Sequence, residues 1–138
     1  MITFVVYGEP QGKGRPKFTQ TGHAYTPERT RAYEVAVIAA FRRGFPKRTK
    51  WEKGVPLCVR IKAVYGIPRS DSKAKREQKL TGAVRPTKKP DADNVGKIIL
   101  DALNGIAWQD DAQIVDLRTV KIYGEVPRVE VEIDEIRY

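Results

Sequence analysis

The longest alternating run in the chain lies between residues 55 and 67. Every second residue from Leu57 to Tyr65 is apolar or aromatic, while Arg60 and Lys62 fall between them. Because successive side chains of a strand point to opposite faces of a sheet, this run predicts a long strand with one buried face. Such a strand needs neighbouring strands beside it and a second layer over its apolar side.

Two main helices are predicted to supply that second layer. The first starts at Thr26-Pro27-Glu28, which provides an N-cap, a proline and an early acid, and it runs to about Arg43. The second starts near Asp93 and stops at Asn104-Gly105. A third, short helix is expected over residues 72–80. The apolar positions that define the two main helices are Ala32, Val35, Ala36 and Ala39, and then Val95, Ile98, Ile99, Ala102 and Leu103.

Three further strands are expected, at residues 2–7, 113–122 and 128–136. Gly124 to Pro127 supplies turn residues between the last two, so we expect these strands to pair as a hairpin. Residues 8–26 hold four glycines and two prolines among basic residues, which predicts a flexible basic loop without regular structure. The whole pattern predicts an α+β fold in which a mixed β-sheet is packed by two main helices, and 138 residues suit one compact domain, 1–138.

The charge of the chain is divided unevenly along its length. Residues 1–90 hold 21 Lys and Arg against 6 Asp and Glu, a net +15, whereas residues 91–138 hold 5 against 11, a net −6. A basic body favours binding to a polyanion, and the acidic part would repel the same polyanion unless cations intervene. The asymmetry indicates nucleic acid and a divalent metal; the alternative for the basic part is a merely soluble basic surface.

Several classes of protein are disfavoured by the sequence. No stretch approaches the roughly 20 apolar residues of a membrane span, and residues 1–4 do not resemble a signal peptide, so we expect a soluble, cytoplasmic protein with no membrane partner. Gly12-Lys13 invites comparison with a phosphate-binding P-loop, but Gly14 stands where Ser or Thr should follow the lysine. We therefore expect no nucleotide cofactor.

Two pairs of acids lie around the second main helix. Asp91 and Asp93 come directly after Pro90, in what we expect to be an extended lead-in where residues two apart point the same way. Asp110 and Asp111 follow the far end of the helix. Neighbouring carboxylates suit Mg²⁺ or Mn²⁺, but one acid of the first pair can equally serve as the helix cap. About 12 helical residues span roughly 18 Å, so Asp111 meets the first pair only if the chain folds back.

Two more residues near these acids have alternative roles. Lys97 either forms an ion pair with Asp93 or Asp101 on the helix surface, or holds a scissile phosphate. Trp108 either stacks on a nucleic-acid base or anchors the core beside the acidic turn.

The chain resembles the RusA-like Holliday junction resolvases in three segments that occur in register, at residues 89–97, 101–105 and 108–115. The resemblance extends to Gly8-Glu9-Pro10, Arg15-Pro16, Tyr25-Thr26-Pro27 and Lys121. It implies a crossover junction endodeoxyribonuclease that works as a homodimer and nicks branched DNA at four-way junctions. Where some members carry Arg before the first acid this chain has Pro90, so the corresponding phosphate contact is left to Lys88, Lys89 or another residue.

Site residues follow from this resemblance and from the charge pattern. The resemblance implies that Asp91, Asp93 and Asp111 bind Mg²⁺, with Mn²⁺ as a substitute, that Lys97 acts at the scissile phosphate, and that Asp110 is an auxiliary neighbour. The expected reaction is metal-assisted hydrolysis of a phosphodiester by water. The alternatives are another Mg²⁺-dependent phosphohydrolase and a non-catalytic DNA-binding protein. The residues expected to bind DNA are Lys13, Arg15, Lys17, Lys73, Lys75, Arg76, Lys79, Lys88, Lys89 and Lys121.

Overall fold

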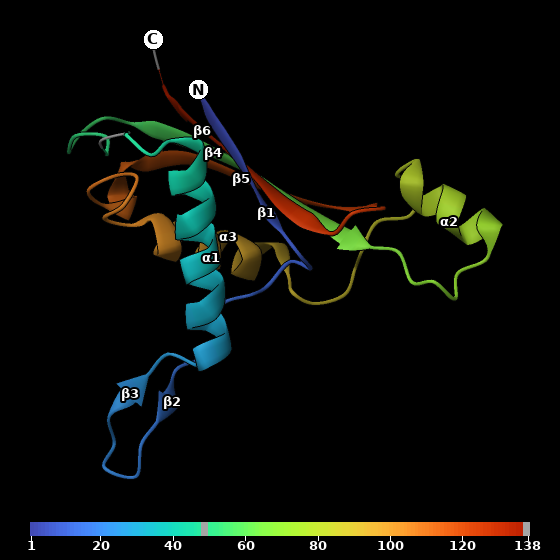
Figure 1. The fold of residues 1–138 in the computed structure, drawn as a ribbon, viewed down its shortest axis with the longest axis horizontal. Coiled ribbons are helices and arrows are strands. Elements are labelled where there is room, and N and C mark those ends of the chain that lie inside the picture. Colours follow the sequence, from blue (N-terminus) through green and yellow to red (C-terminus); the bar gives the residue numbers. More distant parts are fainter. Residues whose placement is uncertain (48–49, 137–138) are drawn as a thin grey trace.

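A four-stranded mixed sheet forms the centre of the protein (Figure 1). The computed structural model describes residues 1–47 and 50–136. The strands are β1 (Ile2–Tyr7), β4 (Leu57–Gly66), β5 (Ile114–Gly124) and β6 (Arg128–Glu135), in the order β1-β6-β4-β5. Strand β4 pairs parallel with β5 and antiparallel with β6. The predicted α+β class and the mixed sheet are confirmed.

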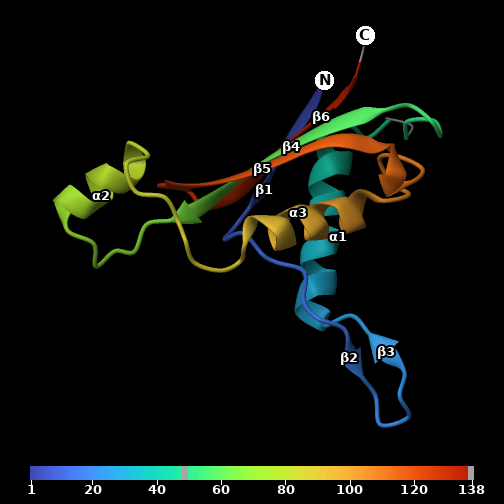
Figure 2. The ribbon, with the colours of Figure 1, turned by 180° about the vertical axis from the view of Figure 1, so that it is seen from behind.

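Helices α1 (Glu28–Gly44) and α3 (Ala92–Leu103) cover the same face of this sheet (Figure 2). The five apolar positions predicted for α3 are all buried. The alternating residues of β4 from Leu57 to Tyr65 are buried too, as predicted. The helices of the described residues include none that is both long and apolar enough to span a membrane.

The predicted apolar face of α1 is wrong. Ala32, Val35, Ala36 and Ala39 are exposed, with Val35 exposed to 64%, and the buried positions are Thr30, Val37, Ala40 and Phe41. This helix is apolar on more than one side. The side that carries the bulky Phe41 has the larger apolar area to bury, so it faces the sheet. There the ring of Phe41 packs edge-on against Phe4. The helix also starts one residue later than expected, with Pro27 and not Thr26 at the N-cap.

The predicted hairpin of the last two strands is also wrong, because β4 lies between β5 and β6. Strand β4 buries Val64 on one face and Tyr65 on the other, each 1% exposed, which favours the central place in the sheet. The connection of residues 125–127 crosses the end of β4. Gly66 permits the crossing, since a Cβ at this position would lie 3.1 Å from the ring of Pro127.

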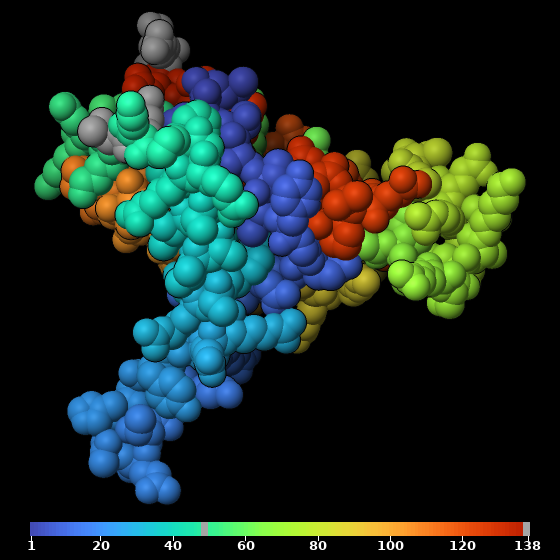
Figure 3. Space-filling model, viewed as in Figure 1, coloured from blue at the N-terminus to red at the C-terminus, as the bar shows by residue number. Residues whose placement is uncertain are grey.

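Two segments project from the body of the molecule (Figures 1 and 3). One carries α2 (Lys73–Leu80), whose N-cap Ser72 accepts a hydrogen bond from the Lys75 amide, so the predicted short helix is confirmed. The other is an antiparallel ribbon of β2 (Lys17–Phe18) and β3 (Ala24–Tyr25). This ribbon corrects the expectation that residues 8–26 lack regular structure.

Candidate active site

Asp91 occupies the N-cap position of α3, yet its side chain accepts no capping hydrogen bond from the helix. The simple capping role considered for this carboxylate is therefore not what the structure shows. Its backbone is extended, whereas Asp93 lies inside the first helical turn, so the two acids do not share one extended lead-in as expected. Both side chains are exposed, and Asp91 lines a cleft.

The cleft has a volume of about 750 Å³ and lies where the loop after β1 passes the start of α3. The loop is held there by the backbone, with the Lys13 amide donating to the Asn94 carbonyl at 3.4 Å. Gly12 allows the close approach, since a Cβ at this position would lie 2.9 Å from Pro90 Cβ. Apart from Glu9 and Asp91, the charged residues that line the cleft are all basic: Lys13, Arg15, Lys17, Arg29, Lys88 and Lys89.

Tyr65 lies behind Asp91 and is missing from the residues predicted for the site. Its hydroxyl donates a hydrogen bond to the carbonyl oxygen of Pro90, the residue before Asp91. Burial of the ring raises the pKa of Tyr65 to about 12, and the nearby charges of Asp91 and Glu9 act in the same direction. The hydroxyl therefore stays protonated and able to donate throughout the neutral pH range.

Lys97 is exposed on α3 and, within the described part of the chain, forms no ion pair. Asp101, one of its two expected partners, instead binds Lys13 at 3.1 Å, and Lys13 also binds Glu34 on α1 at 2.9 Å. The ion-pair reading of Lys97 thus lacks support, and its ammonium group is accessible to a ligand.

Asp111 is held beside the core by Trp108, whose indole N–H donates to Oδ1 of Asp111 at 2.8 Å. Trp108 is fully buried, which confirms the core anchor and excludes stacking of this ring on a base. Partial burial of Asp111 raises the pKa of its carboxyl group; the Trp108 hydrogen bond opposes the shift, and the charges of Asp101 and Asp110 add to it. Asp111 is thus a carboxylate whose negative charge is disfavoured by its surroundings.

The residues around Asp111 have structural roles that fix its position. Asp110 caps the short 3₁₀ helix η1 (Asp111–Gln113) by accepting a hydrogen bond from the Ala112 amide at 3.0 Å. Gln113 accepts from the Asp110 amide and donates to the Val55 carbonyl. Capping is the role that the structure shows for Asp110, and its auxiliary role in the site stays a prediction.

The three predicted metal ligands do not form one cluster within the described residues, where no group of three or more Asp, Glu, His or Cys side chains is placed to hold a metal ion. Asp91 is at the start of α3, whereas the charge of Asp111 interacts with that of Asp101. Asp101 is ten residues after Asp91, which is about 15 Å along the helix at 1.5 Å per residue. The chain folds back after α3, but it brings Asp111 only to the last turns of this helix, near Asp101. Carboxylate oxygens suit a hard divalent cation. In the described part of the chain, however, fewer than three of these carboxylates lie together at any one point.

The basic residues predicted to bind DNA fall into distinct environments. Lys13 and Lys79 are in ion pairs, Lys79 with Asp71, and both side chains are at most 20% exposed. Lys121 lies 5.1 Å from the centre of the Tyr65 ring and donates to the Lys88 carbonyl at 2.6 Å, and Lys88 lies 6.0 Å from the same ring centre. Arg15, Lys17, Lys88 and Lys89 line the cleft, and Lys73, Lys75 and Arg76 lie on α2.

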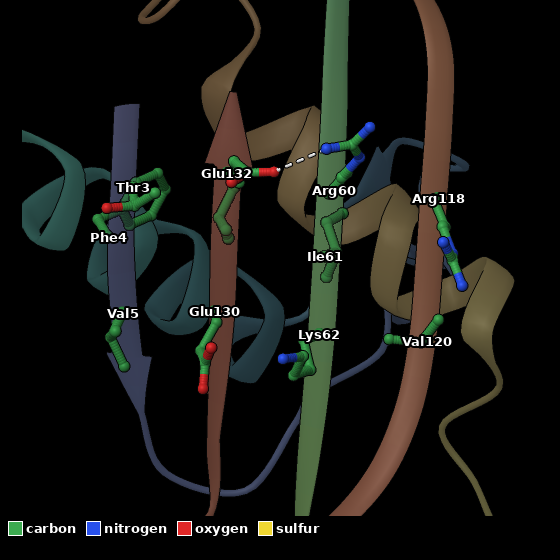
Figure 4. A pocket seen from close by; sticks show the side chains of 11 residues that line it. Thr3, Phe4, Val5, Arg60, Ile61, Lys62, Arg118, Val120, Glu130 and Glu132 are labelled. Atoms are coloured by element: carbon green, nitrogen blue, oxygen red, sulfur yellow. Dashed lines mark hydrogen bonds and ion pairs between the residues drawn. The ribbon is translucent and has the colours of Figure 1, made fainter. Parts of the chain in front are cut away.

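A second pocket, of about 620 Å³, lies on the face of the sheet that the helices leave open (Figure 4). Its polar lining includes Arg60, which binds Glu132 at 3.3 Å, and Lys62, Arg118 and Glu130. None of the predicted site residues lines it, so we place the candidate site in the basic cleft.

Comparisons with known proteins identify the family of the chain. The profile of the family described as Endodeoxyribonuclease RusA matches residues 7–134. The chain is 39% identical to the Bacillus subtilis (strain 168) protein YqaN, itself described as uncharacterized, over 98% of this chain and 96% of the relative. It is 33% identical to the crossover junction endodeoxyribonuclease rusA of Lactococcus phage r1t, over 62% of this chain and 60% of the relative. The chain therefore belongs to the RusA endodeoxyribonuclease family.

Proposed function

We propose that this protein is a Mg²⁺-dependent, structure-specific endodeoxyribonuclease that resolves four-way DNA junctions by paired symmetric nicks, in DNA recombination and repair in the cytoplasm. The observation that carries the proposal is the carboxylate of Asp91, unused by the helix it precedes and exposed in a cleft with basic walls. The phage relative is a crossover junction endodeoxyribonuclease, which supports the proposal that the substrate is a DNA junction.

The cleft is suited to a nucleic-acid backbone. Arg15, Lys17 and Arg29 lie on one part of its wall, and Lys88 and Lys89 on another. Lysine and arginine contacts of this kind neutralise phosphates, and they fix the position of the backbone without reading its sequence. A phosphodiester bound there lies beside Asp91, which is the only acid besides Glu9 in the cleft lining.

On the resemblance and on the oxygen chemistry of their side chains we assign Asp91, Asp93 and Asp111 to the metal, although Asp111 does not lie beside the other two in this structure. Their oxygen donors fit Mg²⁺ or Mn²⁺. Burial raises the pKa of Asp111, so a bound cation would offset the unfavourable negative charge of this carboxylate. When bound, Mg²⁺ supplies Lewis acidity to the phosphoryl group and activates a water molecule. Lys97, exposed and without an ion pair among the described residues, is available to offset the charge that develops on the phosphate.

A homodimer is part of the proposal because a four-way junction has approximate two-fold symmetry and requires two matched nicks. The structure offers a surface for a second copy. Strand β1 is an edge strand, and a groove of about 520 Å³ lies between it and α1, where Ala36 and Ala40 belong to the lining. An apolar edge of this kind favours association with another chain.

The decisive experiment is cleavage of a synthetic four-way junction with and without Mg²⁺. We expect symmetric nicks that a ligase can seal, no cutting of the matched linear duplex, and no activity of Asp91→Asn. A non-catalytic DNA-binding protein would bind the junction and leave it intact in Mg²⁺. A nucleotide phosphohydrolase would instead release phosphate from free nucleotides, so the same preparation is assayed on both substrates.

A further inference from the structure

The β2–β3 ribbon is a formed hairpin and not a loose loop. The Thr19 amide donates to the His23 carbonyl at 2.9 Å, and the Gly22 amide donates to the Thr19 carbonyl at 3.0 Å. Gly22 has φ +87°, the left-handed conformation that commonly closes a three-residue hairpin loop. The hydroxyl of Thr19 also accepts from the His23 amide at 3.1 Å. The sequence therefore encodes a defined shape for this arm.

The ribbon extends away from the sheet, beyond the N-terminal end of α1 (Figures 1 and 3). All residues from Arg15 to Tyr25 are exposed. Two of them are aromatic: Phe18 is 70% exposed and Tyr25 is 47% exposed. A two-stranded hairpin alone is marginally stable in water, and an exposed phenyl ring on such an arm favours burial against a partner.

The charge of the ribbon selects the chemistry of that partner. No Asp or Glu occurs between Glu9 and Glu28, whereas Lys13, Arg15 and Lys17 lie in this interval. Arg15 and Lys17, at the base of the ribbon, belong to the lining of the cleft that holds Asp91. A polyanion bound in the cleft therefore continues onto the ribbon without meeting a repelling charge.

The two faces of the ribbon differ. Directly paired residues of antiparallel strands lie on the same side, so Lys17 and Tyr25 share one face and Phe18 and Ala24 share the other. One face thus carries a cation and a phenol, which suit a phosphate backbone. The other is apolar, which suits the flat surface of a base.

We propose that the ribbon enters the branch point of the DNA and that Phe18 stacks on a base exposed there, while Lys17 contacts the adjacent backbone. This inference rests on the proposed function and adds the element that would recognise the branch. Base–aromatic stacking tolerates any sequence, and apolar side chains are known to open base steps in deformed DNA. A linear duplex offers no such opened base, so Phe18 contributes to the preference for a junction over a duplex.

The test compares Phe18→Ala with Phe18→Trp and with the control Val126→Ala, which removes an apolar side chain that is 51% exposed and that lines neither the cleft nor the groove beside β1. Binding is measured in EDTA to a four-way junction and to a linear duplex of the same sequence. We expect Phe18→Ala to raise the dissociation constant for the junction about 10-fold, the effect of removing one stacked base, and to leave the duplex unchanged. Phe18→Trp and Val126→Ala should bind both substrates as the wild type does.

A second readout reports the base itself. With 2-aminopurine beside the crossover, the wild type should change the fluorescence of the base, whereas Phe18→Ala should not, and Phe18→Trp should restore the change. Junction binding by Phe18→Ala equal to the wild type, or an equal weakening on junction and duplex, would overturn the proposal. The proposal would also be overturned if Phe18→Ala no longer sedimented as a dimer, because the ribbon would then contact a second copy of the chain.

These outcomes are separable from failure of the proposed function. If the wild type binds the junction but does not nick it in Mg²⁺, the nuclease assignment fails while the binding comparison still decides the role of Phe18. If the wild type binds branched DNA no better than duplex DNA, the role of the ribbon in branch recognition is rejected even where nicking is observed.

Discussion

The hydroxyl of Tyr65 donates its hydrogen bond to the carbonyl of Pro90, and Asp91 is the next residue along the chain. Strand β4, from the centre of the sheet, thereby supports the backbone that presents the first acid of the candidate site. Lys88 and Lys121 lie over the ring of the same tyrosine. One buried side chain thus connects the core, the cleft wall and Asp91.

Tyr65→Phe tests this connection, because it keeps the ring and removes only the hydroxyl. We expect a decrease of about 1 kcal/mol in the free energy of unfolding, the usual contribution of one hydrogen bond. If the bond positions Asp91, the Mg²⁺ concentration for half-maximal cleavage should rise several-fold, with the rate at saturating Mg²⁺ nearly unchanged. A metal titration of single-turnover cleavage checks this. A lower maximal rate with an unchanged metal dependence would contradict the positioning role.

The three assigned metal ligands give a second prediction. Asp91→Asn, Asp93→Asn and Asp111→Asn should each abolish cleavage while junction binding stays equal or becomes tighter, because each change removes a negative charge that repels phosphates. Gel assays of binding in EDTA and of cleavage in Mg²⁺ measure the two effects. Asp116→Asn, an exposed position on β5, is the control and should cleave as the wild type does. If any one of the three variants still cleaves in Mg²⁺, the residue that it replaces is not a metal ligand.

Much of this site could be predicted because its signals are local. Asp91, Asp93 and Lys97 occur within seven residues, and the helix that carries them has a clean apolar pattern whose positions are all buried. The role of Tyr65 could not be predicted, since its partner is 25 residues away and the bond depends on where β4 ends relative to Pro90. The sequence does show that a helix of roughly 18 Å separates Asp91 from Asp111, but it does not show how far the chain folds back after that helix.

The incorrect fold predictions have similar causes. A three-residue connection between strands predicts a hairpin, but 125–127 also suffices to cross β4 at Gly66, and only the burial of β4 on both faces decides between these arrangements. In α1 the small apolar residues indicated one face and the bulky ones another, and the side with the larger buried area packs on the sheet.

The raised pKa of Asp111 predicts a dependence of stability on pH. A carboxyl group whose pKa is higher in the folded state contributes its stability fully below the ordinary value of 3.8, and loses it as the pH rises through the folded pKa. Asp111→Asn cannot ionise and keeps an oxygen acceptor for Trp108. It should therefore be more stable than the wild type at neutral pH in EDTA, and equally stable near pH 3. Urea unfolding at both pH values measures the difference.

Mg²⁺ should reduce or reverse that difference at neutral pH, because a ligand that binds only the folded wild type stabilises it. A variant that is less stable than the wild type at neutral pH without metal would contradict the raised pKa.

The basic residues of α2 give a fourth prediction. Lys73 and Lys75 are exposed, whereas Lys79 is paired with Asp71 and lies 4.7 Å from the centre of the Tyr123 ring. If α2 grips the DNA backbone, Lys73→Gln with Lys75→Gln should reduce the slope of log K against log salt by about 2, because each phosphate that is no longer neutralised lowers the slope by about 1. Lys79→Gln should lower stability and leave the slope unchanged. An unchanged slope in the double variant would place the DNA surface away from α2.

Substitution of Lys97 distinguishes a catalytic role from a structural one, because the two roles predict different effects on the cleavage rate and on stability. Its side chain is exposed and forms no ion pair with another described residue, so Lys97→Met should change the free energy of unfolding by no more than about 0.5 kcal/mol. If the ammonium group offsets charge on the phosphate, the same variant should lower the single-turnover rate by roughly 10² or more at saturating enzyme and Mg²⁺. Lys97→Arg keeps the charge with a different reach and planar geometry, and only partial recovery is expected. Cleavage rates and thermal midpoints measured on the same preparations decide the matter, and nearly wild-type cleavage by Lys97→Met would remove Lys97 from the catalytic residues.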